Sequence, residues 1–597
     1  MKYNTYEKRS DIPNTYKWDL SKMYSSSSDI DNDIETVKSL TPQILEYKGH
    51  ILDSSDSLYE FMKLTEKQDR LLEKLYVYSK ISFDVNTKDN KTKSLKMKVE
   101  KLSDDLNEAY SFITPEFMES DYSKVLEYIK DNKKLEEYKF NLECIYRYKN
   151  HSLSKIEEDI FVKAVNAFGN CSEAFNSIDN ADIDLGYITY KGEKTKLTSS
   201  NYSIMMKDKD RNVRIEAFNN MYKYYSGLKN TLSNLYVGEI KESRFVSNVK
   251  KYNSTLEESL YDDNIDISVY KNLIDAIHDN MDAMYDYMGV RKKLLGLDSM
   301  HMYDIYIDLV DKKEESIEFE EGKKILFEAL KPLGEKYLTD LKKAFDEHWI
   351  DIYPNDGKKS GAYSWGCYDS YPYLLLNYND TIDSVSTMAH ELGHSMHSYY
   401  SKKQNYVDSN YPIFLAEIAS TVNEVILNDY LYKNAKTKEE KMYYLTDFLD
   451  MVRTTIYRQT MFAEFEMLMH DKEQNGVSLT EEEISNTYYD LNKLYYGDNV
   501  VSDDLIRYEW SRIPHFYTPF YVYKYATGLS CALSIASRII NGDTKTRDNY
   551  LEFLSSGGSD YPLNILKKVD IDMTSKKTVN DAIEMFKDKL NELKELM

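Results

Sequence analysis

The chain has 597 residues, a formal net charge of −24, and 42% hydrophobic and 13% aromatic residues. This composition excludes a disordered chain, and the length exceeds what one hydrophobic core usually supports, so we expect two or more lobes. The acidic balance repels nucleic-acid backbones and anionic membrane surfaces, so neither is an expected partner.

Glycine and proline are both scarce, with 20 and 10 residues, which favours long helices over many-turned sheets. The four distant cysteines form no CxxC pair, so neither a disulfide framework nor a cysteine zinc cluster is expected. The start of the chain lacks the apolar core of a signal peptide, and no segment reaches the about 18 apolar residues of a membrane span. We therefore expect a mainly α protein of the cytoplasm, without an obligatory protein partner.

Amphipathic helices are predicted from residue 33 to 128, and again from Asn201 to about Ile350. Between these arrays, residues 187–197 carry two short strand-like segments around a glycine, which predicts a β-hairpin. We place a lobe boundary at this hairpin. The predicted division is a helical lobe over residues 1–200 and a second region over residues 201–597.

The local character changes again at Gly361, which opens an aromatic, glycine-containing loop that ends at Gly366. Residues 371–378 are then strand-like. A helix is predicted next, with Asp383 or Ser384 as its N-terminal cap.

This helix carries the segment His390-Glu391-Leu392-Gly393-His394. Residues four apart lie on the same helical face, so the two histidines can direct their imidazoles at one cation. Apolar residues occupy the side away from the histidines, which indicates that one face is buried and that the polar face is available for a functional site. Histidine pairs with this spacing also arise by chance, but the complete HExxH pattern favours one catalytic zinc ion per chain.

Glu391 lies about 100° round the helix from His390, where it can reach a metal-bound water without occupying a coordination position. It is the candidate general base. Zinc would bring the pKa of that water toward about 7, and Glu391 would take its proton and hand it to a leaving amine.

A catalytic zinc also needs a third protein ligand and one open site. His397 is nearest in sequence, but it lies about 10 Å along the axis from His390, so we expect it to pack or to contact substrate. Glu417 and Glu424 share one stripe of a second predicted helix, from Pro412 to about Tyr432. One of them can bind zinc while the other holds a ligand histidine by its free ring nitrogen, and two solvated acids are the alternative.

After His515, the residues Tyr517, Tyr521 and Tyr525 recur four apart, which predicts one side of a helix if Pro519 allows a helix to form. Their hydroxyls could donate hydrogen bonds to the oxyanion formed by water attack. The chain has 55 tyrosines, so packing is the alternative for each of them, and the spacing leaves open which one acts.

Together these residues resemble the oligoendopeptidase F family of thimet-type zinc metallopeptidases. The resemblance rests on His390-Glu391-Leu392-Gly393-His394, Phe414-Leu415-Ala416-Glu417-Ile418-Ala419-Ser420, the opening residues Arg9, Ile12-Pro13 and Trp18-Asp19-Leu20, the late segment Arg512-Ile513-Pro514-His515-Phe516-Tyr517 with Phe520-Tyr521-Val522-Tyr523, and Gly557-Gly558-Ser559-Asp560-Tyr561-Pro562. These landmarks cover essentially the whole chain.

The resemblance implies a mainly α fold, with two helical lobes around a deep substrate channel, zinc at its floor and short β-hairpins near the active site. Residues 201–597 would then be the catalytic zinc metallopeptidase region. The resemblance also assigns the third metal position to Glu417 rather than Glu424. Extended peptides can enter a channel and folded proteins cannot, so it implies an endopeptidase that cleaves short oligopeptides internally.

Family members use the histidine and late tyrosines of this segment for substrate and transition-state contacts, which favours His515 and Tyr517 as catalytic residues, with Tyr521 next. Tyr525 and His397 are further candidates for substrate contact. Residues 373–378 could offer a strand edge that pairs with an extended peptide, and Gly361 would let the preceding loop come close to it. A short structural hairpin is the alternative, and replacing Tyr373 by alanine would then leave peptide affinity unchanged.

Two other functions fit parts of the pattern. HExxH does not specify where a peptide is cut, so a zinc carboxypeptidase or aminopeptidase is possible, with Arg512 as a terminus-binding charge or else a structural ion-pair partner. A peptide-binding protein without activity is the other alternative, and the intact Glu391 argues against it.

Overall fold

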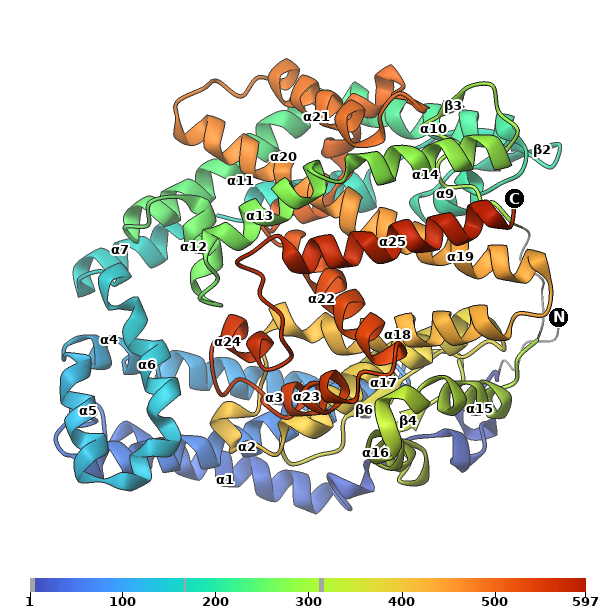
Figure 1. Cartoon of the computed structure of the whole chain (residues 1–597). Coiled ribbons are helices and arrows are strands. Elements are labelled where there is room, and N and C mark those ends of the chain that lie inside the picture. The colour runs from blue at the N-terminus through green and yellow to red at the C-terminus, as the bar shows by residue number, and fades with distance from the viewer. Residues whose placement is uncertain (1–5, 166–167, 311–315) are drawn as a thin grey trace. The chain divides into compact units, whose positions relative to one another are not determined.

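The structure is a computed structural model, and it describes residues 6–165, 168–310 and 316–597. Helices dominate it, and its few strands are short (Figure 1), so the mainly α prediction is confirmed. No helix in these ranges combines the length and the apolar character that crossing a bilayer requires.

The chain divides into two compact units, each built from three separate segments. Unit 1 comprises Met1–Ser152, Glu314–Tyr430 and Ile535–Ile571, and unit 2 comprises Leu153–Lys313, Leu431–Ser534 and Asp572–Met597. The predicted division into functional regions at residue 200 follows the chain instead, and it stays a prediction. The predicted channel stays one too.

The helices of unit 1 are α1 (Ser27–Leu45), α2 (Ser55–Asp84), α3 (Asn90–Ala109), α4 (Ile113–Met118), α5 (Tyr122–Asp131), α6 (Lys139–Arg147), α15 (Phe319–Ala329), α16 (Gly334–Asp346), α17 (Ile382–Ser401), α18 (Ile413–Asn434), which begins in this unit, α23 (Thr544–Leu554) and α24 (Pro562–Lys567). Those of unit 2 are α7 (Lys155–Val165), α8 (Asn170–Asn176), α9 (Ser199–Met206), α10 (Arg211–Gly227), α11 (Lys229–Val249), α12 (Thr255–Tyr261), α13 (Ile267–His278), α14 (Met281–Leu294), α19 (Lys438–Val452), α20 (Arg458–Gln474), α21 (Glu481–Tyr496), α22 (Tyr523–Ile540), which begins in this unit, and α25 (Lys577–Glu595).

The predicted hairpin in unit 2 is confirmed. Its strands β1 (Tyr187–Tyr190) and β2 (Glu193–Lys196) pair antiparallel around a turn at Gly192, whose φ is +81°. A second small sheet of this unit pairs β3 (Met300–His301) with β7 (Val500–Val501) in parallel.

Unit 1 holds a three-stranded sheet in the order β4 (Ile350–Asp351), β6 (Tyr373–Leu375), β5 (Tyr363–Trp365). β6 pairs with β4 in parallel and with β5 antiparallel, so it is the central strand. The prediction that residues 373–378 offer a free edge is therefore wrong for the strand itself, residues 373–375, because β4 and β5 pair with its two sides. The free edge next to the predicted loop belongs to β5.

The N-terminal landmark packs against this sheet. Trp18 meets Tyr373 edge to face, with ring centroids 5.9 Å apart, and the Tyr373 hydroxyl donates a 2.9 Å hydrogen bond to the Asp19 carbonyl. Both aromatic residues belong to a core with α1, α2 and α3, through Val37, Leu75 and Val99. Tyr373 is buried, so its role as a substrate-binding residue is also wrong, and the structural alternative holds.

Candidate metal centre

The helix with the HExxH segment is α17, which begins one residue after its cap. Thr381 is that cap: its side chain accepts a 3.2 Å hydrogen bond from the Ser384 backbone N–H. The prediction of Asp383 or Ser384 as the cap was therefore wrong by a few residues. The predicted apolar stripe is confirmed by complete burial of Val385, Met388, Ala389, Leu392 and Met396.

Gly393 allows α17 and α18 to touch through their backbones. A Cβ at this position would lie 2.5 Å from both the Ala419 carbonyl oxygen and the Ser420 Cα. Such distances are far below van der Waals contact, so a larger residue cannot be accommodated without moving a helix. The glycine inside the HExxH segment therefore lets the second helix come close to the two histidines.

Three side chains converge where these helices meet. The Nε2 atoms of His390 and His394 are 3.2 Å apart, and Oε2 of Glu417 lies 3.7 Å from each of them. Ligands of a tetrahedral zinc ion at about 2.0–2.2 Å are about 3.3–3.6 Å from one another. Two imidazoles and one carboxylate at these separations fit zinc, and they leave its fourth position open.

Glu424 takes a different position from Glu417. Its Oε1 lies 3.4 Å from Nδ1 of His390, the ring nitrogen that faces away from Glu417. A carboxylate on the free nitrogen fixes the tautomer and orientation of an imidazole and raises its basicity. The geometry therefore brings both predicted acids of α18 to the centre, one on each side of His390.

The charges of the centre shift its pKa values in opposite directions. Burial alone would lower the pKa of His390, but the hydrogen bond and charge of Glu424, with smaller contributions from Glu391 and Glu417, raise it to about 9. Burial, followed by the charge of His390, lowers the pKa of His394 to about 3. The acids beside His390 and the burial of His394 therefore move the pKa values of the two imidazoles in opposite directions.

Glu391 is buried beside the histidines, and the strand β5 lies against it. Burial raises the pKa of Glu391 to about 7, although the charge of His390 and a hydrogen bond from the Ser364 backbone oppose the shift. The hydroxyls of Ser364 and Ser395 are 2.8 Å apart, and Ser395 donates to the Glu391 carbonyl at 3.1 Å. β5 is therefore connected directly to the segment that carries the candidate base.

Gly361 precedes β5 and has a φ of +81°, a conformation that favours glycine. No atom lies within 4 Å of the position that its Cβ would occupy, and its carbonyl accepts a 2.7 Å hydrogen bond from the Asn377 side chain. The loop is thus held from one side, with open space on the other.

His397 does not face this space. It is buried, and its ring stacks on Tyr411 with centroids 3.6 Å apart and lies near Phe553 of α23. Burial, with a contribution from His394, lowers its pKa to about 3. The packing alternative therefore holds for His397, and its role as a substrate contact is wrong.

The late aromatic candidates lie in unit 2, on two elements rather than one helix. A 3₁₀-helix covers Pro514–Tyr517 and α22 begins only at Tyr523, because Phe520 between them has a φ of 56°. The prediction of one helical side is therefore wrong. Two of the tyrosines still gather at the predicted histidine: Tyr525 OH lies 3.4 Å from His515 Nε2, and the Tyr521 ring is 6.2 Å from the His515 ring.

Tyr517 faces a different neighbour. Its ring stacks on Phe175 with centroids 4.4 Å apart, and burial raises its pKa. Desolvation by burial also lowers the pKa of His515, with a contribution from Arg458.

The role of one polar residue, which joins the helices α17 and α18, was not predicted from the sequence. Asn423 is buried on α18, donates a 3.0 Å hydrogen bond to the Ala389 carbonyl of α17, and accepts one from the Tyr337 hydroxyl of α16 at 3.1 Å. An asparagine among the apolar positions of a predicted helix was the available signal.

Comparisons with known proteins agree with this arrangement. The sequence profile described as "Peptidase family M3" matches residues 204–585, and that described as "Oligopeptidase F" matches residues 116–184. Oligopeptidase PepF of Bacillus subtilis is 38% identical over 100% of this chain and 89% of its own length. Group B oligopeptidase PepB of Streptococcus agalactiae is also 38% identical, over 99% of this chain and 98% of its own.

Solved structures show the same relation in three dimensions. A putative peptidase from Chlamydophila abortus superimposes with a TM-score of 0.94 at 37% identity, over 99% of this chain and 100% of its own. Oligoendopeptidase-F from Enterococcus faecium gives a TM-score of 0.74 at 33% identity, over 95% of this chain and 99% of its own. The chain therefore belongs to peptidase family M3, among the oligopeptidases of the oligopeptidase F type.

Proposed function

We propose that the chain is a cytoplasmic, zinc-dependent endopeptidase that hydrolyses internal bonds of short oligopeptides. The observation that carries the proposal is the convergence of His390, His394 and Glu417 at 3.2–3.7 Å, with Glu391 on the same helix. The relatives named oligopeptidases support the choice of substrate class.

In this proposal His390, His394 and Glu417 hold one zinc ion, and Glu424 orients the His390 ring through its Nδ1 atom. When bound, zinc supplies a Lewis acid that polarises the scissile carbonyl and acidifies water. Glu391 accepts the proton of the attacking water and returns it to the leaving amine. A pKa near 7 suits this role, because the carboxyl can both take and release a proton at neutral pH.

The substrate would lie along β5, whose outer edge has no partner strand in the three-stranded sheet. An extended peptide that adds to this edge passes the Ser364 backbone next to Glu391, and the open space at Gly361 leaves room for its main chain. Main-chain pairing of this kind accepts many sequences, which fits an enzyme for mixed peptides.

We assign the transition-state contacts to the cluster around His515. Tyr521 and Tyr525 lie beside its ring, and a hydroxyl in such a cluster can donate to the oxyanion. Tyr517, stacked on Phe175, is the weaker candidate of the set.

An exopeptidase remains the second candidate, and the surroundings of Arg512 favour it less. Arg512 donates to Glu509 at 2.9 Å and to the Tyr222 hydroxyl at 3.2 Å, as a structural ion-pair partner does. A peptide blocked at both ends distinguishes the two functions, since only an endopeptidase cleaves it.

The test compares the wild type with Glu391→Gln on that doubly blocked peptide, with zinc per chain measured on both proteins. We expect internal cleavage by the wild type, about one zinc in each protein, and a loss of turnover of at least about 10³-fold in the variant. Products only from unblocked ends would favour the exopeptidase. Equal hydrolysis by Glu391→Gln would contradict the assigned base, and a wild type that stays inactive and binds no zinc when the ion is supplied would favour a binding protein.

A further inference from the structure

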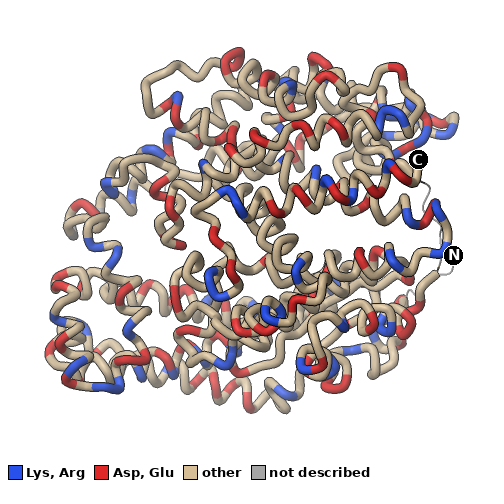
Figure 2. The backbone as a smooth tube through the Cα atoms, viewed as in Figure 1, with Lys and Arg blue, Asp and Glu red and all other residues tan. Residues whose placement is uncertain are grey.

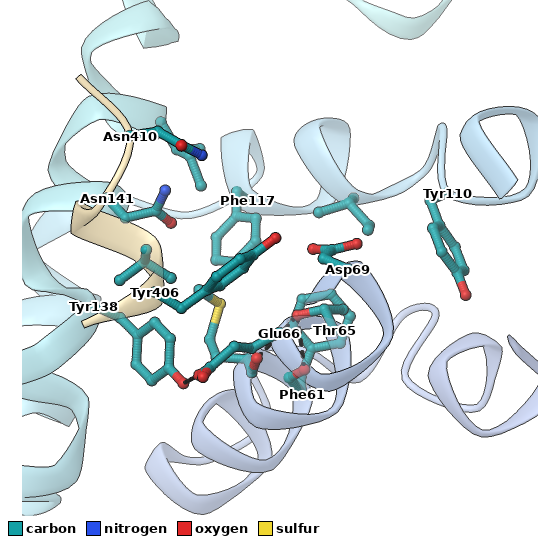
Figure 3. Close-up of a pocket in the computed structure, with 14 residues that line it drawn as sticks. Phe61, Thr65, Glu66, Asp69, Tyr110, Phe117, Tyr138, Asn141, Tyr406 and Asn410 are labelled. Carbon is teal, nitrogen blue, oxygen red and sulfur yellow. Dashed lines mark hydrogen bonds between the residues drawn. The ribbon is translucent and has the colours of Figure 1, made fainter. Parts of the chain in front are cut away.

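A pocket of about 320 Å³ lies in unit 1 among α2, α4, α6 and the short 3₁₀-helix Tyr406–Asp408 (Figure 3). It shares no lining residue with the metal centre. Its walls are mostly aromatic and aliphatic, with Phe61, Phe117 and Tyr406 among them. Few polar groups line it, and they differ in the hydrogen bonds and ion pairs that they form.

One acid of the pocket is fully engaged. Glu66 accepts a hydrogen bond from the Tyr138 hydroxyl, drawn as a dashed line in Figure 3, and pairs with Lys63 at 2.8 Å. Arg70 lies 3.7 Å from its other oxygen. These contacts account for its charge, so Glu66 is part of the wall.

The other acid has no such partner. Asp69 forms no hydrogen bond or ion pair with any residue that the structure describes, and Figure 3 shows its carboxylate and the Tyr406 hydroxyl both turned into the pocket. Desolvation, followed by the charges of Glu73 and Glu66, raises the pKa of Asp69 to about 6. The side chain is exposed at the pocket, and no positive group is among the charges that shift its pKa, so its carboxylate is open to a cationic ligand.

The opposite part of the pocket offers amides. Asn141 and Asn410 come from α6 and from the segment after Asp408, and Figure 3 places their carboxamide groups near each other. Within the described ranges neither side chain makes a hydrogen bond. The pocket thus presents a negative charge and a hydroxyl on one side, two amides on the other, and aromatic rings between them.

We propose that this pocket binds a small organic cation, a primary ammonium or a guanidinium on a short apolar body with a polar far end. The cation would pair with Asp69 and donate to Tyr406, the apolar body would lie against Phe61 and Phe117, and the far end would meet the two amides. Aromatic walls favour cations because their ring faces are negative. An anion is disfavoured, since it would face the carboxylate of Asp69.

Two sources supply this chemistry, free basic amino acids and aliphatic diamines, and both carry a cationic end and a polar far end. The proposal does not rest on the peptidase activity, because binding can be measured without turnover. The pocket is also connected to the catalytic region by sequence, since Tyr406 and Asn410 lie between the ends of α17 and α18.

The experiment is isothermal titration calorimetry of the full-length protein with n-pentylamine as the probe and n-pentanol as its neutral match. We expect saturable binding of the amine and at least about ten-fold weaker binding of the alcohol. Titrations with lysine, arginine and 1,5-diaminopentane then distinguish the two sources. No saturable heat with any of the four cations, or equal binding of the alcohol, would overturn the proposal.

Matched variants locate the site. Asp69→Asn should weaken amine binding at least about ten-fold, because it removes the charge and keeps the shape. Glu60→Gln, an exposed acid of the same helix outside the pocket, should leave it unchanged. Ile113→Trp, which fills the pocket from α4, should abolish amine binding. It tests the same site independently if Asp69→Asn does not fold. Wild-type affinity in either pocket variant would contradict the site.

Discussion

Glu417 and Glu424 are two identical side chains on one helix, seven residues apart, that approach the same histidine from different sides. Their spacing puts them on one stripe of α18, so the same crossing of helices presents both to His390. Position alone then decides what each acid does. In our proposal the acid near Nε2 is a metal ligand, and the acid near Nδ1 holds the ring.

Glu424→Gln is expected to weaken zinc binding by about 10–100-fold, because an amide orients the His390 ring less firmly than a carboxylate does. Competition with a zinc chelator measures this affinity directly. Glu439→Gln, an exposed acid of α19, is the control and should bind zinc as the wild type does. An unchanged affinity in Glu424→Gln would remove the assigned role.

Tyr525→Phe is expected to lower kcat by about 10²–10³-fold with little change in KM, if its hydroxyl stabilises the oxyanion from beside His515. Steady-state kinetics on a blocked peptide measures both constants, and Tyr521→Phe is tested in parallel. Tyr517→Phe is the comparison, and we expect it to keep most of the wild-type kcat. The opposite order, with Tyr517→Phe as the damaging change, would restore Tyr517 as the preferred residue.

At this scale the sequence was sufficient wherever spacing along one helix decides the outcome. The i, i+4 rule alone brings His390 and His394 together, and both acids of α18 could be named from their stripe. His397 could not be placed, because its neighbour Phe553 is far away in the chain. Which of Glu417 and Glu424 lies near the metal position depends on how two helices cross, and spacing along one helix does not encode this. Only the family resemblance distinguished the two acids.

The pair of helices α17 and α18 is the element that makes the centre. Their backbones touch at Gly393, and Asn423 binds one helix to the other through the Ala389 carbonyl. The ligand geometry is therefore determined by how closely two helices approach.

Gly393→Ala should separate the helices, since its Cβ would lie 2.5 Å from the backbone of Ala419 and Ser420. We expect a loss of stability of about 1–3 kcal/mol and weaker zinc binding, because Glu417 moves with α18. Thermal unfolding and chelator competition measure the two effects. Gly227→Ala is the matched control, since its Cβ would meet no atom within 4 Å. A Gly393→Ala protein that behaves like this control would show that the contact is unimportant.

Local patterns predicted helices better than strands. Apolar periodicity gave the buried stripe of α17, but its cap was missed because several capping residues follow one another from Asn379 to Ser384. The central place of β6 could not be predicted, since its partner β4 lies upstream in a segment that had been assigned to helices. The turn at Phe520 was missed because a positive φ is rare for an aromatic residue.

On the scale of the whole molecule, acidic residues are spread over both units (Figure 2), which agrees with the net charge of −24. The buried charges are organised differently. In unit 2, Glu509 accepts hydrogen bonds from Arg458 at 2.7 Å, from Arg512 at 2.9 Å and from the Tyr488 hydroxyl at 2.6 Å. Desolvation opposes its charge, but the two arginines and the hydrogen bonds lower the pKa of Glu509 to about 2.

This shift predicts how acid destabilises the protein. The folded pKa of Glu509 lies below the unfolded one, so the unfolded chain takes up the proton first as the pH falls. The resulting stability, about 3 kcal/mol, is complete above pH about 4.5 and is lost as the pH falls toward 2. Urea unfolding of the wild type and Glu509→Gln between pH 7 and 3 checks this. The variant should be less stable at pH 7 and should lose less on acidification; equal losses in both proteins would contradict the assignment.

Composition was sufficient to predict a mainly α protein, because scarce glycine and proline leave long helical runs uninterrupted. It could not predict the compact units. Each unit joins three separate stretches of chain, and contacts between residues hundreds of positions apart leave no periodic signature in the sequence.

The packing of α23 against α17, through Phe553 and His397, has a consequence for biosynthesis. A ribosome releases α17 long before it has made α23, so the apolar side of the histidine-bearing helix emerges uncovered. Nascent chains that stall before Thr544 would expose this surface to chaperones and proteases. We therefore expect this side of α17 to become fully packed only after almost the entire polypeptide has been translated.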